Sequence, residues 1–188
     1  KETFMPITVG GKIKNLNDIE IRLKLGADKV AINSEAYKNP KFINDAAKEF
    51  GSQCIVISID YKINDDNSSE VFIECGKEST NVEVQDWAKQ VESMGAGEIL
   101  LNSINKDGTG KGYDIEILKN ISELLKCPVI ACGGVGEWEH LCEALLNTDI
   151  DAVAAANIFH YQDQSVFLAK QHLYNKNMNV RKPDLIDI

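Results

Sequence analysis

The sequence has no apolar run that approaches the ~20 residues of a membrane-spanning helix, and no signal peptide is visible in it. It also lacks an excess of positive charge, because 20 Lys and Arg residues stand against 29 Asp and Glu residues, for a net charge of −9. A surface that binds nucleic acid needs clustered Lys and Arg. These absences argue against a membrane protein and against nucleic acid as a partner. An anionic small molecule, which needs only local donors, stays compatible with the acidic chain.

Metal-binding spacings are missing as well. The three histidines do not cluster, and the five cysteines, Cys54, Cys75, Cys127, Cys132 and Cys142, include no CxxC pair. Their odd number and mostly apolar surroundings predict reduced thiols and a cytosolic location, without a metal or another cofactor. Cys132 ends a predicted strand, but no histidine is placed to activate it as a nucleophile. His140 and His172 fall in predicted helices, where we expect them at the surface.

Short apolar runs alternate with stretches of helical period along the whole chain. The predicted strands are 4–9, 29–32, 54–60, 97–101, 128–132 and 152–156, and the predicted helices are 17–25, 41–50, 84–94, 115–125, 137–146 and 165–174. Residues 63–75 read as an inserted hairpin, with a polar turn at 64–69 and a strand at 71–75. Continuous apolar strands are expected when a parallel sheet is buried on both faces. Helices on every connection indicate an α/β fold.

A complete (β/α)8 barrel needs eight such units and ~250 residues. We therefore predict an α/β TIM barrel of which this chain holds six units, as a single partial domain over residues 1–188 with a polar C-terminal tail at 175–188. A doubly wound open sheet is the alternative. Because the chain starts without Met, directly before a strand, we expect it to be a piece of a longer protein that lacks the first two units.

The strand that starts near Gly97 leads into a polar, glycine-rich loop, 102–114, and Asp114 is expected to cap the next helix. Such a loop lets backbone N–H groups approach an anion. An internal repeat supports this interpretation, since Pro6 to Lys12 aligns with Pro128 to Gly134, and 28–33 with 151–157. Two similar glycine-rich ends on one rim predict a ligand with two phosphates.

Asp60 is the sharpest catalytic candidate, because it ends an otherwise apolar strand where a barrel directs side chains into its mouth. A carboxylate there can act as a general acid or base, and Lys62 lies on the same face if the strand continues. Asp107 ends the opposite side of the mouth, although a plain Asx-turn explains it as well. Lys29 and Glu98 begin their strands, so they should lie together at the other end of the barrel, either sealing it or gating it.

Several motifs resemble the cyclase subunit of imidazole glycerol phosphate synthase: Pro6-Ile-Thr-Val-Gly-Gly11, Gly26-Ala-Asp-Lys-Val-Ala-Ile-Asn-Ser34, Ser58-Ile-Asp-Tyr-Lys62 and Asp107-Gly-Thr-x-x-Gly-Tyr-Asp114. The resemblance covers the chain to about His160. It implies a barrel in heterodimeric association with a glutaminase that supplies ammonia. The barrel would convert a bis-phosphorylated ribulosyl-formimino-carboxamide intermediate into imidazole glycerol phosphate and an aminoimidazole carboxamide ribotide, in histidine biosynthesis.

The resemblance also assigns residues by position. Asp60 matches the second of two catalytic aspartates. The phosphate ligands it implies are Gly11, Lys12 and Asn33 at one site and Gly108, Gly133, Gly134 and Asn157 at the other. Lys62, Asn102 and Asp107 are further candidates for binding the substrate. Lys29 and Glu98 match an ammonia gate, and Asp28 and Gln53 match the face that meets the glutaminase.

Departures from the family pattern keep two further hypotheses open. The first catalytic aspartate belongs to a strand that this chain lacks, so we expect the chain as given to be inactive. Lys12 stands where the family has Gly, Asn102 where it has Thr, Asn105 where it has Asp and Asn157 where it has Ser. With these substitutions the chain also resembles a paralogue group, whose members pass ammonia to a nucleotide-linked sugar in surface-polysaccharide synthesis. A non-catalytic activator of a glutaminase is the third hypothesis.

Overall fold

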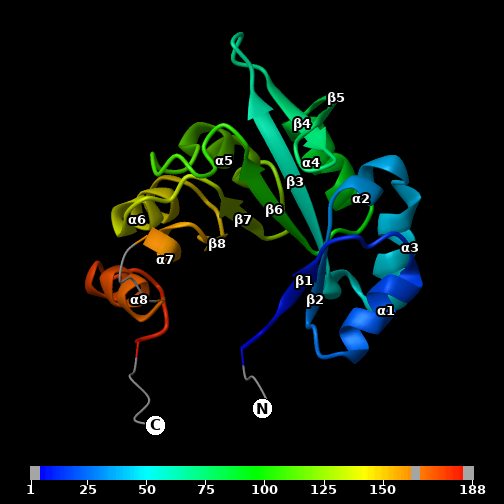
Figure 1. Ribbon diagram of the computed structural model, residues 1–188, viewed down its shortest axis with the longest axis horizontal. Coiled ribbons are helices and arrows are strands. Elements are labelled where there is room, and N and C mark those ends of the chain that lie inside the picture. The colour runs from blue at the N-terminus through cyan, green and yellow to red at the C-terminus, as the bar shows by residue number, and fades with distance from the viewer. Residues whose placement is uncertain (1–4, 162–165, 184–188) are drawn as a thin grey trace.

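Six parallel strands form the main part of one curled, eight-stranded sheet in the computed structural model, which describes residues 5–161 and 166–183 (Figure 1). Their order across the sheet follows the chain, β1-β2-β3-β6-β7-β8. The strands are β1 (Thr8–Gly10), β2 (Lys29–Ile32), β3 (Ile55–Ile63), β6 (Glu98–Ser103), β7 (Val129–Cys132) and β8 (Ala152–Val153). Sequential parallel strands curling in one direction are the arrangement of a (β/α)8 barrel, here with six units. The prediction of this fold class is confirmed.

A helix follows each of these strands on the outside of the sheet (Figure 1). The helices are α1 (Leu16–Lys24), α3 (Lys41–Phe50), α4 (Val84–Ser93), α5 (Ile115–Ser122), α6 (Trp138–Asn147) and α8 (Val166–Asn175). Each buries an apolar stripe, as α3 does with Phe42, Ile43 and Ala46 at helical spacing. No helix in the described part of the chain is long and apolar enough to span a membrane.

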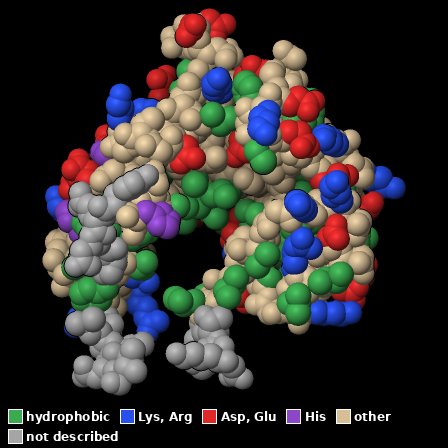
Figure 2. All heavy atoms as spheres, in the orientation of Figure 1, with side chains coloured by type: hydrophobic (Ala, Val, Ile, Leu, Met, Phe, Trp, Pro, Cys, Tyr) green, Lys and Arg blue, Asp and Glu red, His purple; other side chains and the backbone are tan. Residues whose placement is uncertain are grey.

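Buried and partly buried residues alternate along the central strands, so one face of the sheet is covered more fully than the other. In β3, Ile55, Ile57, Ile59 and Tyr61 are all buried, whereas Ser58 and Asp60, which point the other way, are only partly buried. β1 and β8 are the two ends of the strand order. Figure 2 shows a notch between the parts of the molecule that carry them, with hydrophobic side chains along its inner end.

The inserted hairpin is larger than the sequence predicted. β3 runs on past Asp60 to Ile63 and pairs antiparallel with β4 (Ser69–Ile73), which pairs in turn with an unpredicted strand, β5 (Glu78–Glu83). The sequence of β5, ESTNVE, is polar and only Val82 in it is aliphatic, so it carries no apolar strand signal.

Other boundaries differ as well. The predicted strand at 4–9 is reduced to Thr8–Gly10 within the described residues, and that at 152–156 to two residues. The short helices α2 (Ser34–Lys38) and α7 (Ile158–Tyr161) and the 3₁₀ turn η1 (Ser52–Cys54) were not predicted, because elements this short carry no periodic signal. The end of the predicted tail, 184–188, lies outside the described residues.

The internal repeat of the sequence appears as a repeated backbone clamp. Ile7 N–H donates to Asp28 Oδ2 at 2.7 Å, and Val129 N–H donates to Asp151 Oδ2 at 2.9 Å. In return, each aspartate donates its own N–H to the carbonyl of the same partner, at 2.9 and 3.0 Å. The same pair of bonds therefore sets the start of β1 and β7 against the start of the strand that follows.

Candidate active site

Asp60 lies where the C-terminal ends of β2, β3 and β6 meet. Its Oδ2 accepts a hydrogen bond from Asn33 Nδ2 at 3.1 Å, and its Oδ1 accepts one from Asn102 Nδ2 at 3.0 Å. Asn102 is the register partner of Asp60 on β6, and Asn33 directly follows β2. Both carboxylate oxygens thus have an amide donor from a different strand, which fixes the orientation of the carboxylate.

A second layer of bonds holds Asn33 in turn. Asn33 Nδ2 also donates to the Ser58 carbonyl at 3.1 Å, and Asn33 Oδ1 accepts from Ser34 Oγ at 3.2 Å. The Ser34 hydroxyl accepts from the backbone N–H of Glu74 at 3.0 Å, so the inserted hairpin contributes to the network. The sequence placed Asn33 among phosphate ligands, and the structure connects its side chain to the catalytic candidate.

The pKa of the Cys132 thiol is affected by two aspartates of the same rim. It is the register partner of Asn102 on β7. Burial raises the pKa of its thiol, and the negative charges of Asp107 and Asp60 raise it further. Asp107 and Asp60, which come from different strand ends, therefore act on one point of the mouth, and Cys132 stays a neutral thiol.

This arrangement gives a pH-dependent prediction. Asp107→Asn removes a negative charge near Cys132 and should lower the pKa of its thiol, so Cys132 should be alkylated faster at pH 8 than in the parent protein. The measurement is the iodoacetamide rate at Cys132 across pH, by peptide mass spectrometry, in a Cys75→Ser background that removes the exposed competitor. An unchanged rate profile would show that Asp107 does not face the thiol.

A small cleft lies beside this centre, between the loops that follow β6, β7 and β8. Its lining residues are Gly108, Thr109, Gly110, Val135, Gly136, Asn157 and Ile158. Two residues of the predicted second phosphate site, Gly108 and Asn157, are thus in one cleft. The other two, Gly133 and Gly134, form the backbone just before Val135, with φ angles of 92° and 106°.

Close backbone packing shapes this cleft. Gly112 N–H donates to the Gly134 carbonyl at 2.8 Å, and a Cβ on Gly134 would lie 2.1 Å from the Gly112 carbonyl oxygen. The Tyr113 hydroxyl donates to the Ala154 carbonyl at 2.8 Å, which ties the loop after β6 to the chain after β8.

The prediction that His140 lies at the surface is wrong, because only 15% of its side chain is exposed and its Nδ1 accepts the Gly136 N–H at 3.1 Å.

The other predicted phosphate loop lies at the end of β1. Gly10 pairs with Ala31, so Gly11 and Lys12 emerge beside Asn33 at the same edge of the sheet. Lys12 adopts φ 54°, a left-handed conformation that Gly adopts more readily. Arg22 Nη2 donates to the Gly11 carbonyl at 3.0 Å and braces the loop.

Among the described residues, Lys62 makes no hydrogen bond or ion pair with Asp60, Asn33 or Asn102. Its ammonium lies over the Phe72 ring, 5.6 Å from the ring centroid, on the inserted hairpin.

Lys29 and Glu98 form an ion pair at the opposite, N-terminal end of the strands. Val56 of β3 is the register partner of Glu98, so the pair bridges β2 and β6 across the strand between them. Gln53, in η1, is exposed near the same end. The Asp28 carboxylate binds the Ile7 N–H, which is a structural role that the sequence did not predict.

Sequence reasoning missed a buried polar group behind the rim. Tyr61, Ser103 and Asp114 are all buried, and the Tyr61 hydroxyl interacts with the side chains of both Ser103 and Asp114. Asp114 occupies the N-cap position of α5, as predicted, although its side chain makes no cap hydrogen bond. Burial raises the pKa of the Asp114 carboxyl. Only the approach of β3 to the start of α5 brings these residues together.

The comparisons with known proteins agree with this geometry. The chain matches the family described as histidine biosynthesis protein over residues 1–165. It is 51% identical over 178 residues to the imidazole glycerol phosphate synthase subunit HisF of Hydrogenobaculum sp., covering 95% of this chain and 71% of the relative. It is 46% identical over 182 residues to the same subunit of Alkaliphilus metalliredigens, covering 97% and 72%. The chain therefore belongs to the histidine biosynthesis family, among the HisF subunits of imidazole glycerol phosphate synthase.

Proposed function

We propose that Asp60 is the general acid or base of the cyclase reaction of imidazole glycerol phosphate synthase in this protein. In that reaction ammonia and the bis-phosphorylated ribulosyl-formimino-carboxamide intermediate give imidazole glycerol phosphate and an aminoimidazole carboxamide ribotide. The observation that carries the proposal is the Asp60 carboxylate, held by Asn33 and Asn102 on a rim with glycine-rich loops on either side. Ring closure needs protons removed and returned at fixed atoms, which suits an oriented carboxylate.

The order of the strands supports a substrate that spans the rim. Gly11 and Lys12 follow β1, Asp60 lies in β3, and the cleft around Gly108 and Asn157 involves the loops after β6, β7 and β8. A substrate with one phosphate at each end would cross Asp60 on its way between the two loops. Backbone N–H groups and the Lys12 ammonium are suitable partners for these phosphates. The loops after the last strands are a common place for phosphate in TIM barrels.

Ammonia is proposed to enter at the Lys29–Glu98 pair, from a glutaminase docked on the face that carries Gln53. Glu98, Leu100 and Asn102 alternate with buried residues along β6 and share one face of the sheet. Four residues of strand correspond to about 13 Å. A small molecule that passes the ion pair would therefore reach the amide that holds Asp60 by following a single strand.

Removing the charge of Lys29 tests this route. Lys29→Met should lower glutamine-driven turnover in the complex with the glutaminase while leaving ammonium-driven turnover unchanged, because only the first uses the gate. Stability should also fall, because the substitution leaves the mostly buried Glu98 carboxylate, whose side chain is only 18% exposed, without its partner. The measurement is the ratio of the two rates, with the exposed Lys41→Met as the matched control. Equal loss of both rates would contradict a gating role.

The function itself is tested with a chain extended to the full length of its HisF relatives. Supplied with excess ammonium and no glutaminase, it should consume the ribulosyl-formimino intermediate and release imidazole glycerol phosphate. A folded protein that binds the intermediate without turnover would contradict the proposal. That result would favour ammonia delivery to a nucleotide-linked sugar, or activation of a glutaminase without catalysis.

A further inference from the structure

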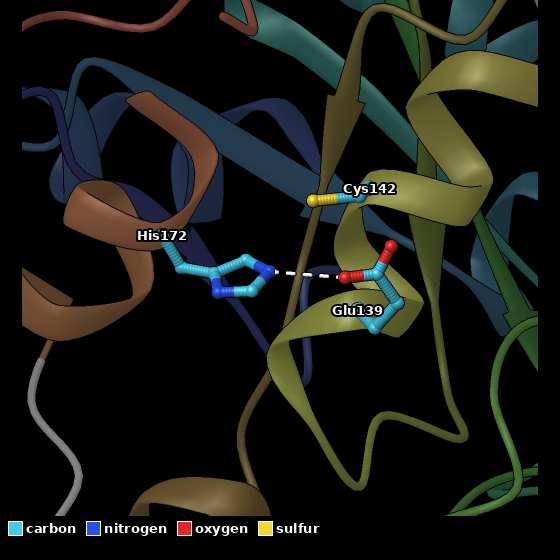
Figure 3. Close-up of side chains that lie close together, drawn as sticks. All are labelled: Glu139, Cys142 and His172. Atoms are coloured by element: carbon cyan, nitrogen blue, oxygen red, sulfur yellow. Dashed lines mark hydrogen bonds and ion pairs between the residues drawn. The ribbon is translucent and has the colours of Figure 1, made fainter. Parts of the chain in front are cut away.

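Packing of α8 against α6 brings three metal-ligand side chains together away from the active site. Glu139 and Cys142 are three residues apart on α6 and share one face of that helix, and His172 reaches them from α8 (Figure 3). One carboxylate oxygen, the thiol sulfur and one imidazole nitrogen all lie within 4.8 Å of one another. The Glu139 Oε2 to His172 Nε2 distance is 3.2 Å.

The three side chains offer the ligand atoms that zinc prefers: a thiolate sulfur, an imidazole nitrogen and a carboxylate oxygen. Zinc bonds of about 2.0 to 2.3 Å in a tetrahedron place ligand atoms roughly 3.3 to 3.7 Å apart. Contraction from at most 4.8 Å therefore requires shifts of about 1 Å. Cys142 is fully buried, whereas the Glu139 and His172 side chains are 53% and 31% exposed, so these two can move while the sulfur stays fixed.

We propose that Glu139, Cys142 and His172 form a zinc site that joins α8 to α6, with a water molecule in the fourth position. A thiolate and a carboxylate would balance the two positive charges of the ion. The bond would fix the last described helix of the chain to the barrel. This role is separate from the proposed catalysis, which takes place at the strand ends.

Two cations compete with the metal: the Lys176 ammonium, which binds Glu139, and the proton on the Cys142 thiol. The Lys176 ammonium lies 3.2 Å from Glu139 Oε2 and would have to release that oxygen. Burial raises the pKa of the Cys142 thiol, the Glu139 charge raises it further, and Lys176 lowers it. Binding would replace the S–H bond with an S–Zn bond and release the proton to solvent, so affinity should increase with pH. The charged or titratable groups around the thiol are Glu139, His172 and Lys176.

The experiment titrates the full chain, purified without a polyhistidine tag, with Zn²⁺ against a chromophoric chelator, and with Co²⁺ as a spectroscopic probe. We expect one ion per chain, a thiolate-to-cobalt charge-transfer band and a higher midpoint of thermal unfolding with Zn²⁺. Cys142→Ser and His172→Asn should each weaken binding by at least about tenfold, which is the lower end of what even an outer-shell partner contributes. Lys176→Met should tighten binding by removing the competitor.

The matched control is Cys75→Ser, because Cys75 is exposed and outside the cluster. It should keep both the affinity and the cobalt band. Absence of stoichiometric binding in the parent chain, or binding that survives both Cys142→Ser and His172→Asn, would overturn the proposal. The partly exposed His172 keeps the test decisive if the buried Cys142→Ser variant does not fold.

Discussion

Asp60→Asn is expected to reduce ammonium-driven turnover about 10²- to 10⁴-fold, the usual contribution of a general acid or base. An amide cannot take or give the proton at that position. It also carries one NH₂ group, which would face the NH₂ group of either Asn33 or Asn102, so one of the two hydrogen bonds at 3.0 and 3.1 Å is lost.

The measurement is single-turnover consumption of the ribulosyl-formimino intermediate by a chain extended to the length of its HisF relatives. Calorimetry measures binding of the same intermediate. Binding should persist while chemistry stops. Asp65→Asn, in the exposed turn of the inserted hairpin, is the matched control and should leave the rate unchanged. Turnover within twofold of the parent rate in Asp60→Asn would remove Asp60 from the reaction and leave it a structural role.

Gly134→Ala is expected to cost about 3 kcal/mol or more of folding stability. Gly134 has φ 106°, and a Cβ would lie 2.1 Å from the backbone oxygen of Gly112, which cannot rotate away. The bond from Gly112 N–H to the Gly134 carbonyl would be broken or stretched. For a chain of this size, such a loss lowers the unfolding midpoint by about 6 to 12 °C. The phosphate affinity proposed for the cleft lined by Gly108 and Asn157 should fall with it.

Gly11→Ala is the matched control, because Gly11 has a similar φ of 97° but no atom lies within 4 Å of the point that its Cβ would occupy. It should show only the cost of the left-handed conformation, about 1 to 2 kcal/mol. Thermal unfolding of the two variants separates backbone strain from steric overlap. Equal effects at the two positions would mean that the contact between Gly134 and Gly112 is not tight.

The alternatives left open by the sequence are separated by the comparisons rather than by the geometry. Asn102, Asn105 and Asn157 depart from the expected pattern, yet the chain as a whole is 51% and 46% identical to two HisF subunits. The structure shows what two of these residues do. Asn102 donates to Asp60, and Asn105 both accepts from and donates to the backbone of Ile63, at 2.8 and 3.1 Å. An aspartate at position 105 could not make the second bond.

The sequence by itself determined the six βα units and the place of Asp60 in the C-terminal half of an apolar strand, although β3 runs on to Ile63 rather than ending at Asp60. Both depend on local patterns, since buried parallel strands are continuously apolar and outer helices follow a period of 3.6 residues. The polar strand β5 and the short helices α2 and α7 carry no such pattern and became visible only in the structure.

Only the tertiary structure decided which distant side chains meet. The Asn33–Asp60–Asn102 cluster depends on the register of three strands, whereas the Lys29–Glu98 pair was expected because both residues begin their strands. The cluster of Glu139, Cys142 and His172 depends on how α8 packs on α6. Spacing along the chain says nothing about such contacts, because they are set by the pairing of strands and the packing of helices that the whole apolar core stabilises.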